Sequence, residues 1–156
     1  MKRKYEKVYQ FKISLKGIKP PIWRRIQIPE TYNFWNFHVA IQDAMGWFDC
    51  HLHHFEVINP RTQVPEEIGI PDEDGWGDIE IIPGRSRKIS KYFTGSQKKA
   101  KYLYDYGDCW EHTVQLERIV DRISAFDYPI RKYLVFKGQA FFSSLSNDST
   151  PVFGAK

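Results

Sequence analysis

Residues 8–28 read V-Y-Q-F-K-I-S-L-K-G-I-K-P-P-I-W-R-R-I-Q-I and contain two segments of alternating polarity joined by a turn. In Val8 to Leu15 every second side chain is apolar, as in a strand that buries one face. Gly17 to Pro21 is rich in turn residues, and Ile22 to Ile28 alternates again until Pro29 ends it. The stretch therefore predicts an antiparallel hairpin.

The periodicity changes to that of a helix immediately after this hairpin. From Phe34 to Met45 the apolar side chains recur every three to four residues. Thr31 or Asn33 can cap the beginning of the helix, and Gly46 stands where a left-handed residue commonly ends one. These features predict a helix over residues 34–45.

The rest of the chain predicts further strands. His51 to Ile58, Lys101 to Asp105 and Cys109 to Val120 alternate in polarity, Ile79 to Ile82 forms a short strand, and residues 59–78 form a long acidic loop. Two strands, one helix and several more strands indicate an α+β fold: a curved, mainly antiparallel, roll-like sheet packed on one main helix. The predicted core consists of Tyr9, Phe11, Ile13, Trp23 or Ile22, Ile26, Phe37, Ile41, Phe55, Val57, Trp110 and Val114.

Length and composition limit the class of protein. A chain of 156 residues with 16% aromatic residues is long enough to form one domain around its own packed core. Its two cysteines, Cys50 and Cys109, exclude a cysteine-based zinc finger and a C-x-x-C redox motif. We find no apolar stretch of signal-peptide or transmembrane length. We therefore expect a cytoplasmic protein with reduced thiols and no membrane partner.

Three histidines and a carboxylate suggest a site for a divalent metal, the single cofactor that we consider. The candidate ligands are His51, His53, His112 and Asp108, with Asp105 as an alternative carboxylate. His51 and His53 alternate and so share one face of a strand, and two histidines with one carboxylate suit zinc or iron. The competing interpretation is structural: the imidazoles form hydrogen bonds inside the sheet, and the aspartates shape the turn at Gly107.

Basic residues suggest a second kind of site. The candidate nucleic-acid-binding residues are Arg85, Arg87, Lys98, Lys99 and Lys101. Residues 98–104, K-K-A-K-Y-L-Y, interleave lysines with tyrosines, as proteins that bind single strands do. The same alternation is typical of an amphipathic strand, and a net charge of +4 is ordinary for a solvated surface. Both interpretations remain open at this stage.

Four separated motifs resemble one family. They are P-P-I-W-R-R-I at residues 20–26, A-I-Q-D-A-M-G-W at 40–47, H-L-H-H-F at 51–55 and Y-D-Y-G-D-C-W-E-H at 104–112. In this order they are similar to the plasmid open-reading-frame-three-like family, named after a root-inducing plasmid; some members are labelled TnpR because they accompany insertion elements. The motif residues are Trp23, Trp47, Tyr104, Asp105, Gly107, Asp108, Trp110 and His112. The resemblance covers residues 8 to about 120 and implies a compact α+β domain without an established activity.

The end of the chain departs from the family pattern. We predict one domain over residues 1–128 and a divergent tail over residues 129–156. No serine or tyrosine stands out as a nucleophile for resolvase chemistry. The sequence therefore favours a non-catalytic binding or accessory module associated with mobile DNA or nucleic acid. The alternative is a metal-dependent hydrolase that uses the histidine and aspartate set. The partner and the oligomeric state stay undetermined.

Overall fold

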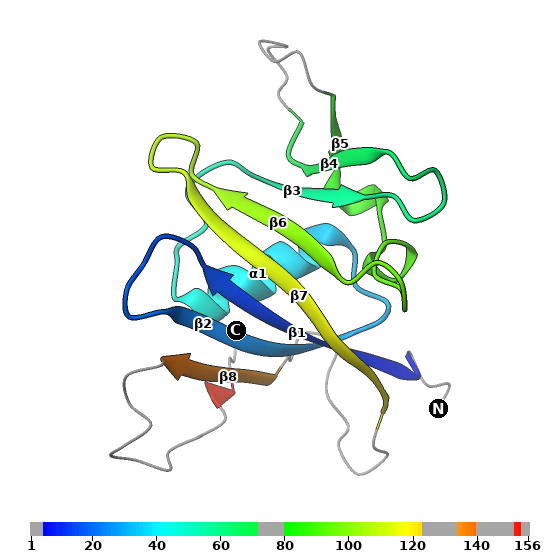
Figure 1. Cartoon of the computed structure of the whole chain (residues 1–156), viewed down its shortest axis with the longest axis horizontal. Helices are drawn as coiled ribbons and strands as arrows, with labels where there is room; N and C mark the ends of the chain where they lie inside the picture. Colours follow the sequence, from blue (N-terminus) through cyan, green and yellow to red (C-terminus); the bar gives the residue numbers. More distant parts are fainter. Residues whose placement is uncertain (1–4, 72–79, 123–133, 140–151, 154–156) are drawn as a thin grey trace.

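A computed structural model describes residues 5–71, 80–122, 134–139 and 152–153 (Figure 1). This part of the chain contains one α-helix, α1 (Phe34–Met45), and two short 3-10 helices, η1 (Gly84–Ser86) and η2 (Ile89–Lys91). The strands are β1 (Lys7–Leu15), β2 (Ile22–Pro29), β3 (His53–Ile58), β4 (Pro65–Gly69), β5 (Ile81–Pro83), β6 (Lys99–Tyr104), β7 (Trp110–Asp121), β8 (Leu134–Gln139) and β9 (Val152–Phe153).

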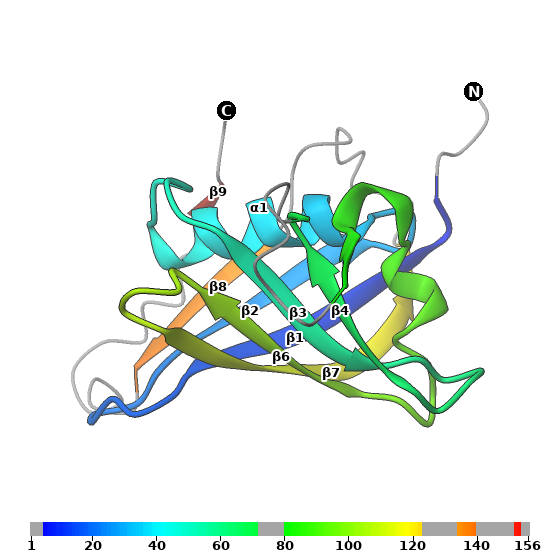
Figure 2. The same cartoon turned by 90° about the horizontal axis from the view of Figure 1, so that it is seen from above.

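The strands form one sheet in the order β5-β4-β3-β6-β7-β1-β2-β8-β9. Among the described strands every neighbouring pair is antiparallel except β4 and β5. Figure 2 shows that the sheet curves and that α1 lies against its hollow face. This arrangement confirms the predicted α+β class with a mainly antiparallel sheet on one main helix. No helix within the described ranges has both the length and the apolar character needed to cross a bilayer.

The segments that begin the chain fold as their patterns predict. β1 and β2 pair in register from Val8 opposite Pro29 to Leu15 opposite Ile22. The helix begins after Asn33, whose side chain accepts a hydrogen bond from the backbone N–H of Asn36 (2.8 Å). It ends at Gly46, which has a left-handed φ of 79° and donates its N–H to the carbonyl of Gln42.

Several predicted strand ends differ from the structure by one or two residues, as in β6, which begins at Lys99 and not at Lys101. Two differences are larger or have a clear cause. Residues 59–78 are not one long loop, because Pro65 to Gly69 forms β4 and pairs with β3. The strand predicted from His51 begins only at His53, since the backbone before it turns to meet the 104–112 segment. The predicted domain boundary at residue 128 lies outside the described residues. Beyond it, β8 pairs with β2 and so extends the sheet.

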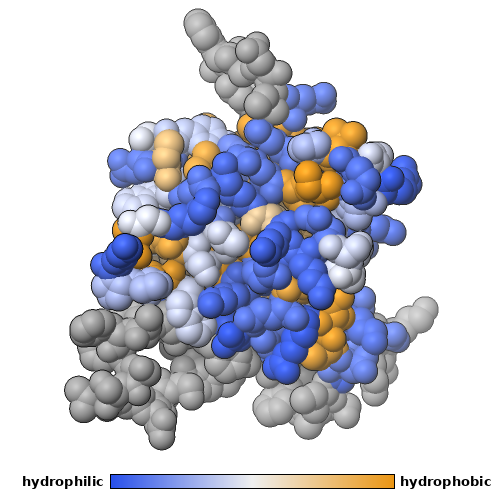
Figure 3. Space-filling view, in the orientation of Figure 1, coloured by the Kyte–Doolittle hydropathy of each residue, from blue (hydrophilic) through white to orange (hydrophobic). Residues whose placement is uncertain are grey.

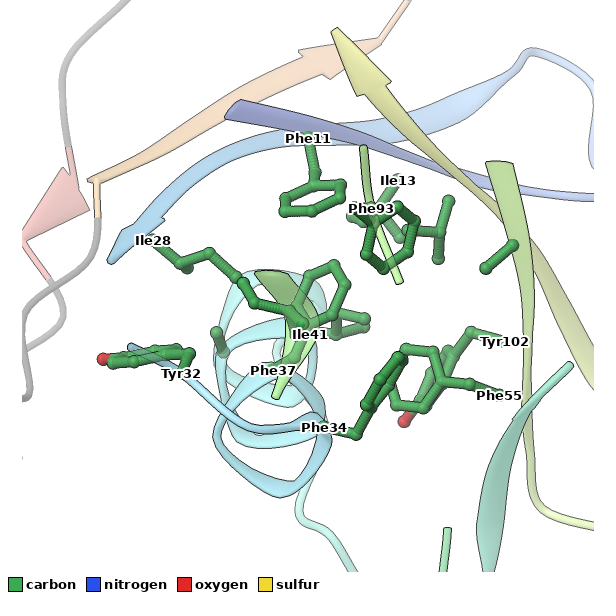
Figure 4. Packing of buried hydrophobic residues seen from close by; sticks show 14 of the residues in the cluster. Phe11, Ile13, Ile28, Tyr32, Phe34, Phe37, Ile41, Phe55, Phe93 and Tyr102 are labelled. Carbon is green, nitrogen blue, oxygen red and sulfur yellow. The ribbon is translucent and has the colours of Figure 1, made fainter. Parts of the chain in front are cut away.

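The core lies between α1 and the sheet and is rich in phenylalanine (Figure 4). Phe37 of the helix contacts Phe11 of β1 with ring centroids 4.5 Å apart and Phe55 of β3 at 5.4 Å. Most of the predicted core is fully buried, whereas Trp23, Ile22 and Trp110 are half-buried. The sheet face turned away from α1 is mainly hydrophilic with small apolar patches (Figure 3). One side of the sheet therefore holds the helix, and the other faces solvent.

Candidate functional site

Motifs that are far apart in the sequence meet at one end of the sheet, which we call the motif end and define as residues 46–52 and 104–112. It lies where α1 ends and where β6 passes into β7, on the left of the view in Figure 1. The backbone N–H of Asp105 donates to the carbonyl of Leu52 (3.0 Å), and that of Cys50 donates to the hydroxyl of Tyr104 (3.1 Å). The two segments therefore support each other.

The backbone of the motif end is held in an uncommon conformation. Asp49, Asp105 and Cys109 have φ values of 53°, 62° and 54°, in the left-handed region that non-glycine residues rarely adopt. The Asp105 carboxylate accepts hydrogen bonds from the N–H groups of Gly107 (3.0 Å) and Asp108 (3.4 Å). Asp105 thus shapes the turn, as the structural interpretation of the sequence predicts. Strain of this kind is found preferentially at functional sites.

Aromatic rings fill the space beneath these segments. Trp47 stacks on Tyr104 with centroids 4.8 Å apart, lies 6.2 Å from Trp110 and meets His112 at 5.1 Å. Phe48 contrasts with this layer, because 93% of its surface is exposed. A single exposed Phe side chain is unremarkable, but this one projects from a loop whose two ends are fixed.

A chain of buried hydrogen bonds runs from α1 toward the motif end. Gln42 Nε2 donates to the Tyr102 hydroxyl (2.9 Å), and Gln42 Oε1 accepts from the N–H of Asp49 (3.0 Å). The Tyr102 hydroxyl is 2.8 Å from His38 Nδ1, and Asp49 Oδ1 is 2.6 Å from His38 Nε2. Because a carboxylate can only accept, Nε2 of His38 carries the proton and donates to Asp49. His38 Nδ1 then accepts from Tyr102.

The His53 ring lies flat on the His38 ring. The centroids are 3.4 Å apart and the planes differ by 4°. His53 is 1% exposed, and its Nδ1 has no hydrogen-bond partner. Burial lowers the pKa of both imidazoles to about 3 and that of His112 to about 4. All three rings are therefore neutral at pH 7.

The structure does not gather the four predicted metal ligands. His51 is exposed and lies 3.4 Å from the Asp105 carboxylate, because it precedes β3 instead of sharing a strand face with His53. Asp108 is exposed on the turn. His112 is buried under Trp47, with Nδ1 3.3 Å from the carbonyl of Tyr102 and Nε2 without a partner. Of the four predicted ligands, His53 is the one that lies in a group of possible metal ligands within the described residues.

The described ranges contain two groups of three possible metal ligands. Within each group, one ligand atom from each residue lies within 4.8 Å of the other two. The first group is His38, Asp49 and His53, and the second is His54, Glu56 and Glu67. His38 and Asp49 were not among the ligands predicted from the sequence. In the second group, the nitrogen Nδ1 of His54 is bonded to the Tyr106 hydroxyl (2.8 Å). Lys101 lies 2.7 Å from Glu56 and already supplies a positive charge to that group. We interpret the second group as a surface ion-pair network.

The basic candidates have different surroundings in the structure. Lys101 projects from the outer face of the sheet and is paired with Glu56 and Glu111. Arg85 lies instead beside the beginning of α1, with its guanidinium 4.4 Å from the centroid of Trp35. The remaining three, Arg87, Lys98 and Lys99, are exposed. Lys101, paired on the outer face of the sheet, and Arg85, beside Trp35 of α1, therefore do not share one surface.

Comparison with known proteins agrees with the motifs. The model of the family described as plasmid pRiA4b ORF-3-like protein matches residues 7–139. The chain belongs to this family. The match includes β8 and extends past residue 120, where the motif resemblance ends.

Two relatives of this family member are themselves without a known function. The uncharacterized protein y4hQ of Sinorhizobium fredii (strain NBRC 101917 / NGR234) is 36% identical over 111 residues, which are 71% of this chain and 54% of the relative. The chain thus spans about half the length of that relative. A crystal structure of MM3350, a protein of unknown function from Methanosarcina mazei Go1, has a TM-score of 0.73 and 46% identity. That comparison covers 80% of this chain and 67% of MM3350.

Proposed function

We propose that the protein is a non-catalytic binding module, that its recognition surface is the motif end, and that it binds a protein partner through a basic segment. The observation that carries this proposal is the charge of the motif end. Residues 46–52 and 104–112 contain four acidic side chains and no lysine or arginine, in a chain whose net charge is +4. Glu111 is paired with Lys16 and Lys101, so Asp49, Asp105 and Asp108 carry the negative charge of this surface. A local surface of the opposite sign to the whole protein attracts cationic groups and repels phosphates.

Aromatic side chains add a reason to prefer a cationic partner. Phe48 is 93% exposed and directly precedes Asp49. Tyr106 is 40% exposed and lies two residues before Asp108. Lysine and arginine bind favourably over an aromatic face beside a carboxylate. The loops that carry these side chains are fixed by hydrogen bonds, so little conformational entropy is lost on binding.

The other functions considered for this chain have weaker support. A hydrolase that uses His51, His53, His112 and Asp108 needs these groups to converge, and they lie apart. A nucleic-acid-binding surface needs the lysines and arginines to line one face, whereas Lys101 is neutralised by two glutamates. Association with mobile DNA therefore stays a prediction from the family resemblance.

Titration of isotope-labelled protein with short peptides tests the proposal by NMR. We expect a peptide of alternating arginine and glycine to shift the backbone amides of residues 46–52 and 104–109, and a glutamate–glycine peptide to leave them in place. Phe48→Ala and Asp108→Asn should each weaken binding about tenfold, as removal of one good interface contact does. Val64→Ala is the matched control, since Val64 is also exposed (54%) but lies in the β3–β4 turn.

A single-stranded oligonucleotide provides the opposing arm of the experiment. Should it shift the amides of Lys98 and Lys99 while the basic peptide shifts nothing, the protein is a nucleic-acid binder and our proposal is wrong. Basic-peptide binding that Phe48→Ala and Asp108→Asn leave unchanged also contradicts it, because the surface would then lie elsewhere.

A further inference from the structure

We infer that His38, Asp49 and His53 form a binding site for a single divalent transition-metal ion. One ligand atom from each residue lies within 4.8 Å of the others, and the three residues come from α1, the following loop and β3. Two imidazoles with one carboxylate are a typical ligand set for zinc, cobalt or ferrous iron. This inference does not depend on the binding of a basic partner.

An unpartnered nitrogen points to a missing ligand. His53 Nδ1 is buried and makes no hydrogen bond, although an unsatisfied buried polar group destabilises the folded state. The second group of possible ligands has no such orphaned nitrogen. His54 Nδ1 lies 2.8 Å from the Tyr106 hydroxyl and His54 Nε2 lies 3.5 Å from Glu56 and 3.7 Å from Glu67, while Lys101 pairs with Glu56. A metal ion would remove the deficit at His53, whereas the second group has no comparable need.

The stacking of the two rings indicates that the His53 ring must move when the ion binds. Aromatic pairs prefer offset or edge-to-face geometries with centroids about 4.5–7 Å apart, whereas the rings of His38 and His53 lie parallel at 3.4 Å. A metal ion binds in the plane of an imidazole, and two parallel planes share no point. The His53 ring must therefore turn on binding, and this turn breaks no hydrogen bond at its Nδ1.

His38 must change its proton position but not its place. Nε2, which donates to Asp49 in the structure, has to offer its lone pair to the ion. The proton then resides on Nδ1, which donates to the Tyr102 oxygen 2.8 Å away, and the Tyr102 hydroxyl hydrogen rotates away. Metal-bound histidines commonly donate their second N–H to such a partner. The side chain of Asp49 is 36% exposed and provides the route from solvent.

Cobalt is the most informative probe, because its visible absorption reports the number and type of its ligands. We expect one Co²⁺ per chain to bind saturably to protein prepared with a chelator, and Zn²⁺ to displace it. His53→Phe keeps an aromatic ring at this position but removes both ring nitrogens, and it should abolish saturable binding. Asp49→Asn should weaken it, and Tyr102→Phe should weaken it about 10–100-fold through the lost support of His38.

Two control variants make the assignment unambiguous. His51→Ala removes an exposed histidine of the motif end and should change Co²⁺ affinity less than twofold. His54→Gln removes the histidine of the second group and should likewise change Co²⁺ affinity less than twofold. The inference is overturned if no saturable Co²⁺ or Zn²⁺ binding is found, or if binding survives His53→Phe. Circular dichroism of each variant separates lost metal binding from lost folding.

Discussion

The three buried histidines should make the protein sensitive to mild acid. The pKa of His38 and of His53 is lowered to about 3 and that of His112 to about 4, with burial as the main cause. In the unfolded chain each imidazole regains its usual pKa of 6.5. Below pH 6.5 the unfolded state therefore binds protons at these three histidines that the folded state does not bind. Stability is full above pH 6.5 and is lost as the pH falls from there toward the folded-state values.

The size of the effect follows from the linkage between protonation and folding. One pKa unit corresponds to about 1.4 kcal/mol, so each histidine costs about 2 kcal/mol between pH 7 and pH 5. The three together cost about 6 kcal/mol, because all of them remain neutral in the folded state at pH 5. A domain with a total stability of roughly 5–15 kcal/mol would lose a large share of it. We expect metal-free protein to be close to unfolding at pH 5.

Chemical denaturation followed by tryptophan fluorescence measures this loss at pH 7, 6 and 5. His112→Phe keeps a ring under Trp47 but cannot take up a proton, so it should reduce the pH dependence of the unfolding free energy by about a third. His51→Gln is the control for a histidine substitution outside the core, because the His51 side chain is exposed. A free energy that changes by less than about 1 kcal/mol between pH 7 and pH 5 would refute the reasoning.

Three further predictions concern the fold that holds the site. Gly69→Ala should destabilise the folded protein by at least about 1–3 kcal/mol, because its Cβ would lie 2.3 Å from the carbonyl oxygen of His53. Gly95→Ala is the control, because a Cβ there meets nothing within 4 Å. An equal loss of melting temperature in the two variants would contradict this prediction. Asn33→Ala removes the helix cap and should cost about 1 kcal/mol in denaturant unfolding; no change would mean that the cap is dispensable. Phe37→Ala leaves a cavity and should cost about 3–5 kcal/mol in the same measurement, and a cost below about 1 kcal/mol would contradict the packing.

The sequence predicted those elements whose burial follows a simple period. The helix over residues 34–45 and the β1–β2 hairpin bury one face each, and their caps and turns are local in sequence. The strand at Pro65 to Gly69 could not be found in this way. It is short, and Ile68 is its one buried hydrophobic side chain, while Glu66 and Glu67 are polar and only partly exposed. Its existence depends on pairing with β3, which no local pattern records.

The candidate site was predicted in part, for a related reason. His53 and His112 occupy positions of the predicted strands that share a face with apolar residues, and both are buried. His38 was missed because its partners come from other elements: Asp49 from the loop after α1, and Tyr102 from β6. One signal was available. His38 lies four residues after Phe34 and three before Ile41, on the apolar face of the helix, so a polar group there needs partners in the core.

The uneven distribution of charge connects the proposals about function. The motif end accounts for four of the 19 acidic residues and for none of the 23 lysines and arginines. The rest of the chain therefore carries 23 basic against 15 acidic side chains, a net charge of +8. A basic partner and a nucleic acid would thus approach different parts of the same molecule, and binding one does not exclude binding the other. Salt separates the two, because a contact spread over many phosphates weakens steeply with ionic strength, whereas a partner held by Phe48 and a few carboxylates weakens less steeply.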